Sequence, residues 1–116
     1  MIVDDDPRNI FALKLTLKAR DFRIETSTTA KDAIEILKSD PDIGIVLMDM
    51  MMPDMDGYTA LKIIRQAPSI NTIPIVAVTA QAMQEDRQKC LDAGAQAYVK
   101  KPIDVDLLLK SIEKLL

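Results

Sequence analysis

The feature that most limits the possible folds is an uninterrupted apolar run, residues 43–48, which ends in the carboxylate of Asp49. A short run without alternating polar positions is typical of a strand buried on both faces, as in the centre of a parallel sheet. No helical pattern follows until Asp56-Gly57. Open α/β sheets place their chemistry where strands end and loops leave the sheet. Asp49 is therefore a candidate functional residue, although alone it could equally be a turn or cap residue.

Strand-like runs alternate with helical patterns along the whole chain. We expect strands at residues 2–3, 23–26, 43–48, 75–79 and 97–99, and helices at 7–20, from 30 to the Asp40-Pro41 stop, at 57–66, at 83–93 and from 105 to 116. The strand at 23–26 alternates as an exposed edge strand does. Five strand–helix units in succession predict an α/β fold, a parallel sheet with right-handed crossovers and helices on both faces.

Two of the predicted helices differ sharply in their apolar faces. The last helix, with Asp104 as its predicted N-cap, has a continuous apolar stripe made of Val105, Leu108, Leu109, Ile112 and Leu116. The helix at 83–93 has a thin stripe, since Met83, Cys90 and Leu91 lie among polar residues, and Gly94 is its predicted C-terminal stop. We therefore expect the helix at 83–93 to move more easily than the last one.

Length and composition exclude several classes of protein. The 116 residues are enough for a single domain, 1–116, with one core. A net charge of −3 without a basic stripe argues against nucleic-acid binding. One cysteine, no long apolar run and no signal-like start predict a cytoplasmic protein that does not enter membranes. The absence of histidine removes histidine-based catalysis and most zinc sites.

Charged and hydroxyl side chains follow the buried strands. Asp4-Asp5 follows the first strand, Asp49 the third, Thr79 the fourth and Lys101 the fifth. In a parallel sheet these ends share one edge, so the side chains converge there. Adjacent carboxylates repel unless a cation neutralises them, and Mg²⁺ prefers such oxygen ligands. With a lysine and a hydroxyl, this set could hold a phosphoryl group, and one aspartate could be the nucleophile.

Each of these residues also has an ordinary structural interpretation. The acids at 4–6 could begin a helix, Thr79 could bond to the backbone, and Lys101 could be a solvated loop lysine. The methionines at 50–52 and 55 are interpreted as packing, and Cys90 as a small buried apolar residue. It is their joint occurrence at successive strand ends that favours a functional site.

These residues carry a family resemblance over essentially the whole chain. The chain resembles the receiver domain of two-component response regulators, most closely receivers of the hybrid sensor kinase type, in the motifs Val3-Asp4-Asp5, Met48-Asp49, Met52-Pro53, Met55-Asp56-Gly57, Val78-Thr79-Ala80 and Lys101-Pro102-Ile103. The resemblance implies a flavodoxin-like fold with strand order 2-1-3-4-5. Its short first strand suggests a domain cut from a longer chain.

The resemblance also implies a role for each site residue. Asp49 would be the phosphoacceptor, and Asp4, Asp5, Asp49 and the backbone carbonyl of Met51 would hold Mg²⁺. Thr79 and Lys101 would contact the phosphoryl group, Thr79 and Tyr98 would form the switch, and the Lys101-Pro102 peptide would be cis. The donor would be a phosphohistidine on a sensor histidine kinase or a histidine phosphotransfer domain. We expect a monomer or weak dimer that performs no multiple turnover.

Two alternatives and one expectation about rate complete the sequence-based hypotheses. Asp4, Asp6, Thr79, Lys101, Asp104 and Asp106 superficially follow the order of haloacid-dehalogenase-type phosphatases. That interpretation leaves Asp49 unexplained, and Pro7 does not fit it. A receiver fold used only as a non-phosphorylated scaffold is the other alternative.

Met51 and Gln81 flank the expected path of the hydrolytic water, and because Met51 supplies no acid or base we expect slow hydrolysis.

Overall fold

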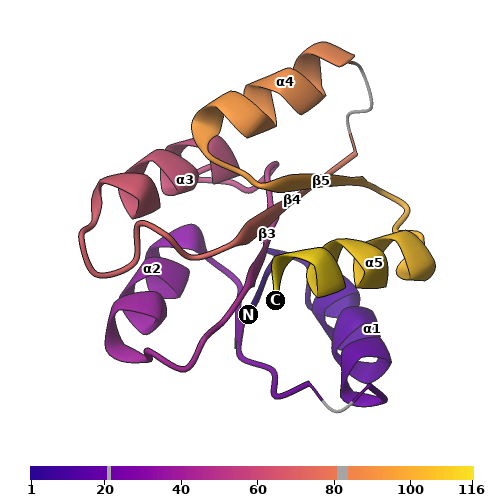
Figure 1. The fold of residues 1–116 in the computed structure, drawn as a ribbon. Helices are drawn as coiled ribbons and strands as arrows, with labels where there is room; N and C mark the ends of the chain where they lie inside the picture. The colour runs from indigo at the N-terminus through magenta and orange to yellow at the C-terminus, as the bar shows by residue number, and fades with distance from the viewer. Residues whose placement is uncertain (21, 81–83) are drawn as a thin grey trace.

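The computed structural model describes residues 1–20, 22–80 and 84–116. Five parallel strands form one sheet in the order β2-β1-β3-β4-β5, and helices cover both of its faces (Figure 1). The elements are β1 (Ile2–Val3), α1 (Pro7–Lys18), β2 (Thr26–Ser27), α2 (Ala30–Ser39), β3 (Val46–Asp49), α3 (Gly57–Gln66), β4 (Ile75–Thr79), α4 (Gln84–Ala93), β5 (Ala97–Lys100) and α5 (Val105–Leu115). The predicted fold class and strand order are confirmed.

The two faces of the sheet bury separate apolar clusters. Helices α1 and α5 lie side by side on one face and contribute Leu13, Leu17, Leu108 and Ile112 to its cluster (Figure 1). On the other face the apolar sides of α2, α3 and α4 pack with β3 and β4. Because β3 and β4 are covered on both faces, every residue in them is buried, which explains their nearly continuous apolar sequences.

Side-chain caps fix where four of the helices begin. The carboxylates of Asp6, Asp56 and Asp104 and the hydroxyl of Thr29 accept hydrogen bonds from backbone amides in the first turns of α1, α3, α5 and α2. Each of these four helices follows a strand-end loop, and the caps of α1, α3 and α5 hold the loops that carry the candidate site. The predicted caps at Asp6 and Asp104 are confirmed.

Several predicted boundaries are wrong. The second strand is Thr26–Ser27 rather than 23–26, and the third is Val46–Asp49 rather than 43–48. In both strands, the hydrogen bonds to neighbouring strands begin further along the chain than the sequence pattern does. The periodicity of a sequence does not show how a strand is paired with its neighbours. The first helix ends at Lys18, two residues before the predicted Arg20.

The predicted apolar stripe of the last helix is only partly correct. Leu108, Leu109 and Ile112 are buried, whereas Val105 at the start of the helix and Leu116 just after its end are exposed. In α4 the buried residues are Cys90 and Ala93, in agreement with the thin stripe expected there, while Met83 lies outside the described residues. None of the helices in the described ranges combines the length and apolar character that crossing a membrane requires.

A half-buried guanidinium, that of Arg65, joins α3 to the end of α4 and the start of β5. Arg65 donates to the carbonyl of Gly94 from Nε at 2.9 Å and from Nη2 at 2.7 Å, and to the carbonyl of Ile73 at 2.7 Å. It also donates to the side-chain oxygen of Gln96, which accepts from the amide of Ile75. Gly94 ends α4 with φ of +117°, a conformation that favours glycine, and its predicted role as the helix stop is confirmed.

Gly57, the first residue of α3, is required by close packing against the loop that follows Asp49. A Cβ atom at this position would lie 2.6 Å from both Cα and Sδ of Met50 and 2.9 Å from the carbonyl oxygen of Asp49. Two of these three atoms belong to the backbone, so a side chain would have to displace the loop itself. Gly44 offers the opposite case, since a Cβ there would meet only Leu116 Cδ2 at 3.6 Å.

We therefore expect Gly57→Ala to destabilise the protein by about 2–3 kcal/mol, because the overpacked loop must shift. Gly44→Ala, the matched control, should change the free energy of unfolding by less than about 1 kcal/mol. Urea unfolding of both variants measures the difference. Equal stability of the two variants would contradict this account of Gly57.

Candidate functional site

The predicted strand-end residues lie together at the carboxyl edge of the sheet. Asp4 and Asp49 are each 3% exposed and Thr79 is fully buried, whereas Asp5 is exposed and Lys101 is half-buried. Asp4 and Asp5 follow β1, Asp49 and Thr79 are the last residues of β3 and β4, and Lys101 follows β5. A buried pair of carboxylates beside one ammonium is unusual, since burial disfavours charge unless it is paired.

Backbone hydrogen bonds continue past the strand ends and fix this edge. The amide of Asp4 donates to Ser27 at 3.1 Å, that of Met50 to Val78 at 2.9 Å and that of Lys101 to Thr79 at 2.8 Å. The amide of Met51 donates to Oδ1 of Asp49 at 3.0 Å. The site therefore rests on the sheet's own ladder rather than on free loops, which keeps its geometry well defined.

The ammonium of Lys101 bridges the two buried acids. Its Nζ lies 3.3 Å from Oδ2 of Asp4 and 3.4 Å from Oδ2 of Asp49. The Lys101-Pro102 peptide is cis, as the resemblance implied. Lys101 comes from the strand at one edge of the sheet and Asp4 from the opposite half, so this pair joins elements far apart in the sequence.

The charges at this edge shift one another's proton affinities. Burial is the main cause that raises the pKa of Asp49, and the charge of Asp4 adds to it, while the amide of Met51 and the ammonium of Lys101 oppose it. For Lys101, burial lowers the pKa, but the attraction of Asp49 and Asp4 outweighs it, so the pKa is raised. Lys101 therefore stays charged, and the edge keeps an excess of negative charge.

Oxygen atoms of Asp4, Asp5 and Asp49 form a group that fits a divalent cation. One carboxylate oxygen from each residue lies within 4.8 Å of the others. Three acids against one ammonium leave uncompensated negative charge, and an all-oxygen donor set suits Mg²⁺ rather than a softer metal. Met51 lies directly beside this group because its amide bonds to Asp49.

The methionine-rich loop after β3 divides into packing and exposed residues. Met50 is fully buried and Met52 nearly so, whereas the side chain of Met51 is 53% exposed. Asp54 turns the loop with φ of +67°, a conformation that aspartate tolerates better than most residues. The packing interpretation holds for Met50 and Met52, and Met51 is left beside Asp49 at the surface. Gln81, its predicted counterpart, lies outside the described residues.

Tyr98 and Cys90 lie on the α4 side of the site. Tyr98, on β5, is half-buried against the core, and burial raises its pKa. Cys90 is fully buried, and its Sγ lies 3.7 Å from the hydroxyl of Tyr58, so the predicted interpretation of Cys90 as a packing residue is confirmed. Register places Tyr98 opposite Ala77 of β4, two residues before Thr79.

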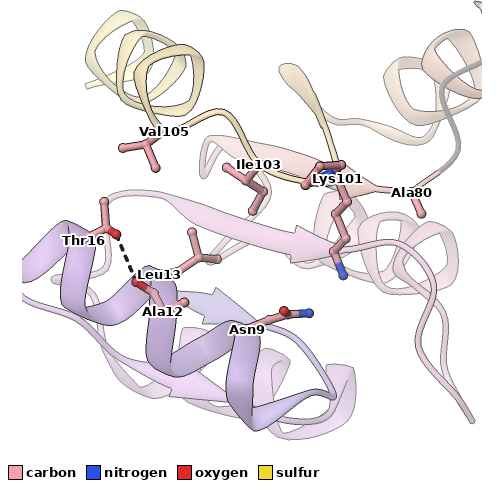
Figure 2. A pocket seen from close by; sticks show the side chains of 9 residues that line it. Asn9, Ala12, Leu13, Thr16, Ala80, Lys101, Ile103 and Val105 are labelled. Carbon is pink, nitrogen blue, oxygen red and sulfur yellow. Dashed lines mark hydrogen bonds between the residues drawn. The ribbon is translucent and has the colours of Figure 1, made fainter.

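An apolar groove of about 520 Å³ opens beside Lys101. Figure 2 shows it between α1 and the segment that leads into α5. It is lined by Asn9, Ala12, Leu13, Thr16, Ala80, Lys101, Pro102, Ile103 and Val105. The ammonium of Lys101 points out of one end of the groove toward the acids, so a molecule seated in the groove would reach the site directly.

One contact at the site was missed by the sequence-based reasoning. The side-chain amide of Asn9, in the first turn of α1, donates to Oδ2 of Asp4 at 3.4 Å. Asp4 follows β1 and Asn9 lies in the first turn of α1, so the way the chain enters α1 brings the two side chains together. The spacing alone therefore carried no signal.

Comparison with known proteins identifies the family. The model of the response regulator receiver domain matches residues 1–113.

The chain belongs to the response regulator receiver family.

Relatives and solved structures agree with this assignment. The chain is 37% identical over 112 residues to the sensor histidine kinase RcsC of Salmonella typhimurium, covering 97% of this chain and 12% of that protein. It is 38% identical over 108 residues to the signal transduction histidine-protein kinase BarA of Escherichia coli, covering 93% and 12%. The chain thus spans a small part of these relatives' length. The predicted likeness to hybrid-kinase receivers is confirmed.

Solved receiver structures show the same fold. The signal receiver domain of a signal transduction histidine kinase from Syntrophus aciditrophicus superposes with a TM-score of 0.89 at 27% identity, covering 99% of this chain and 86% of that one. A response regulator receiver protein from Pseudomonas putida gives 0.90 at 26% identity, with 97% and 93% covered.

The receiver geometry does not support the phosphatase alternative. Asp6 and Asp104, two of the acids that it needs, use their carboxylates to cap α1 and α5. Asp106 is exposed in the first turn of α5, and its backbone amide bonds to Asp104. Asp49, which that alternative leaves unused, is instead the buried acid that Lys101 contacts.

The raised pKa of Asp49 predicts a stability cost in the receiver. The pKa of Asp49 is higher in the folded than in the unfolded state. The stability that protonated Asp49 contributes to the folded state is therefore complete only below the unfolded pKa, and it is lost as pH rises through the folded pKa. At neutral pH the carboxylate therefore opposes folding. We expect Asp49→Asn to stabilise the metal-free protein at pH 7 by on the order of 1 kcal/mol.

The gain should shrink as pH is lowered toward 4, when Asp49 itself becomes protonated. Thermal and urea unfolding of both proteins across this range measure it. Asp5→Asn, at an exposed position, is the matched control and should change stability little. A less stable Asp49→Asn protein at pH 7 would refute this electrostatic account.

Proposed function

We propose that residues 1–116 act as one receiver domain that takes a phosphoryl group from a phosphohistidine onto Asp49. The observation that carries this proposal is the position of Asp49: buried at the end of β3, in contact with Lys101, and within a group of three acids. Membership of the receiver family supports it independently. The site matches the requirements of phosphoryl transfer, which are positioning and charge neutralisation.

In the transfer, a carboxylate oxygen of Asp49 attacks phosphorus. A P–O bond forms as the P–N bond to the donor imidazole breaks, and the electron pair of that bond leaves with the imidazole. Lys101 neutralises charge on the phosphoryl oxygens, and the hydroxyl of Thr79 donates to one of them. Asp4, Asp5, Asp49 and the backbone carbonyl of Met51 hold Mg²⁺, which supplies further positive charge when bound.

The phosphorylated site then shifts the population between two conformations. Added negative charge at Asp49 draws Lys101 and Thr79 toward the phosphoryl group, and Tyr98 on the neighbouring strand turns inward. Helix α4 resettles in response, because it buries only two side chains, Cys90 and Ala93. Hydrolysis is slow, since the side chain of Met51 offers neither an acid nor a base.

The phosphohistidine donor docks over the groove between α1 and α5. The groove is apolar and ends at Lys101. The donor is the dimerisation domain of a sensor histidine kinase or a histidine phosphotransfer domain, since the relatives RcsC and BarA are histidine kinases in which the part similar to this chain covers 12% of the protein. The domain works as a cytoplasmic switch, as a monomer or weak dimer, and not as a turnover enzyme.

The first test of this proposal is the identity of the acceptor. Asp49→Asn should abolish the added phosphate mass that acetyl phosphate and Mg²⁺ produce in the unchanged protein, measured by intact-mass spectrometry. Asp54→Asn, in the loop that follows Asp49, is the matched control and should be phosphorylated normally, because asparagine tolerates the positive φ at that position. Phosphate persisting in Asp49→Asn would refute the assignment.

A second test separates docking from chemistry. Val105→Asp places a charge on the lining of the groove and should slow transfer from a phosphohistidine domain at least about tenfold, since a donor docked there would bury that unpaired charge. Phosphorylation by acetyl phosphate should be unchanged. Leu107→Asp, exposed on α5 outside the groove, is the control. The donor is taken from a panel of phosphohistidine domains that phosphorylate the unchanged chain; equal rates for both variants would refute docking in the groove.

A further inference from the structure

Three donors converge on the buried carboxylate of Asp4. The backbone amide of Asp6 donates to Oδ1 at 2.9 Å, while Lys101 Nζ at 3.3 Å and Asn9 Nδ2 at 3.4 Å both donate to Oδ2. Among the described residues, Lys101 and Asn9 are the side chains that contact this carboxylate. Asp4 is 3% exposed, so water has little access to replace either of them.

Asn9 and Lys101 approach Asp4 from opposite sides of the groove. In Figure 2 the side chain of Asn9 projects from α1 and that of Lys101 descends from the segment after β5, and their nitrogen atoms point into the same space. The two donors differ in one important respect. Lys101 is shared with Asp49, whereas the amide of Asn9 contacts Asp4 and no other described acid.

We propose that Asn9 is a positioning residue that holds the Asp4 carboxylate in place for the divalent cation. This rests on the proposed function, in which Lys101 moves toward the phosphoryl group on Asp49. When Lys101 leaves, Asn9 and the amide of Asp6 keep Asp4 oriented.

The chemistry of an amide suits this task. A second cation at position 9 would neutralise Asp4 and compete with the metal ion, and an acid would add repulsion to a site that already holds three carboxylates. A neutral donor stabilises the ionised acid and leaves its charge available to the metal. The hydrogen bond from Asn9 to Asp4, at 3.4 Å, is longer than a typical N–H···O bond, so its effect on Mg²⁺ binding should be moderate.

The test is the Mg²⁺ affinity, measured by amide NMR titration without any phosphate donor. Asn9→Leu, of similar size but without a donor, should weaken Mg²⁺ binding about three- to tenfold, less than the 10–100-fold usual for partners of direct ligands. Asn71→Leu makes the same chemical change at an exposed position far from the site and should leave the affinity unchanged. Thermal unfolding checks that each variant folds, and Asn9→Ala carries the same prediction.

A double-variant comparison isolates the positioning role. In a Lys101→Met background Asn9 is the remaining side-chain donor to Asp4 among the described residues, so Asn9→Leu should weaken Mg²⁺ binding by a larger factor there than in the unchanged protein. Equal Mg²⁺ affinity of Asn9→Leu and the unchanged protein would overturn the inference while leaving the proposed function intact. An unchanged protein that binds neither Mg²⁺ nor beryllofluoride would overturn both.

Discussion

The whole site depends on one ammonium that contacts two buried carboxylates. Asp4 and Asp49 lie at the ends of adjacent strands and are both buried, and burial raises the pKa of Asp49. Lys101 contacts both carboxylates at 3.3 and 3.4 Å, but its single charge cannot balance Asp4, Asp49 and Asp5 together. The negative charge at this edge of the sheet is therefore not fully neutralised, and we expect a further positive charge to bind favourably there.

The sheet keeps this unfavourable arrangement in place. Ladder hydrogen bonds continue one residue past β3 and β5, so Met50 and Lys101 cannot retreat to relieve repulsion. Gly57 allows α3 to begin within van der Waals contact of Met50, which closes the loop behind Asp49. On the remote side Arg65 donates to four backbone and side-chain acceptors in two segments, the loop before β4 and the loop before β5. Packing and hydrogen bonds far from the acids thus offset the repulsion between them.

The sequence predicts the parts of this site that depend on strand order, and misses the parts that depend on orientation. Asp49, Thr79 and Lys101 could be placed because parallel strands end at one edge whatever their exact bounds. The first and last residues of β2 and β3 could not be predicted, because they depend on the pairing of each strand with its neighbours. The contact of Asn9 with Asp4 depends on how α1 crosses the sheet edge, which no local pattern encodes.

The distribution of contacts along α4 limits how it can respond to a charge change at Asp49. Its buried side chains, Cys90 and Ala93, both lie in its last turn and a half, where Arg65 also binds the carbonyl of Gly94. The described residues of its first turn, from Gln84, are mostly exposed. Local stability follows burial, so the end nearer the site is the weaker one. We therefore expect the proposed resettling of α4 to be a rotation about its anchored C-terminal end, with α3 and the start of β5 staying in place.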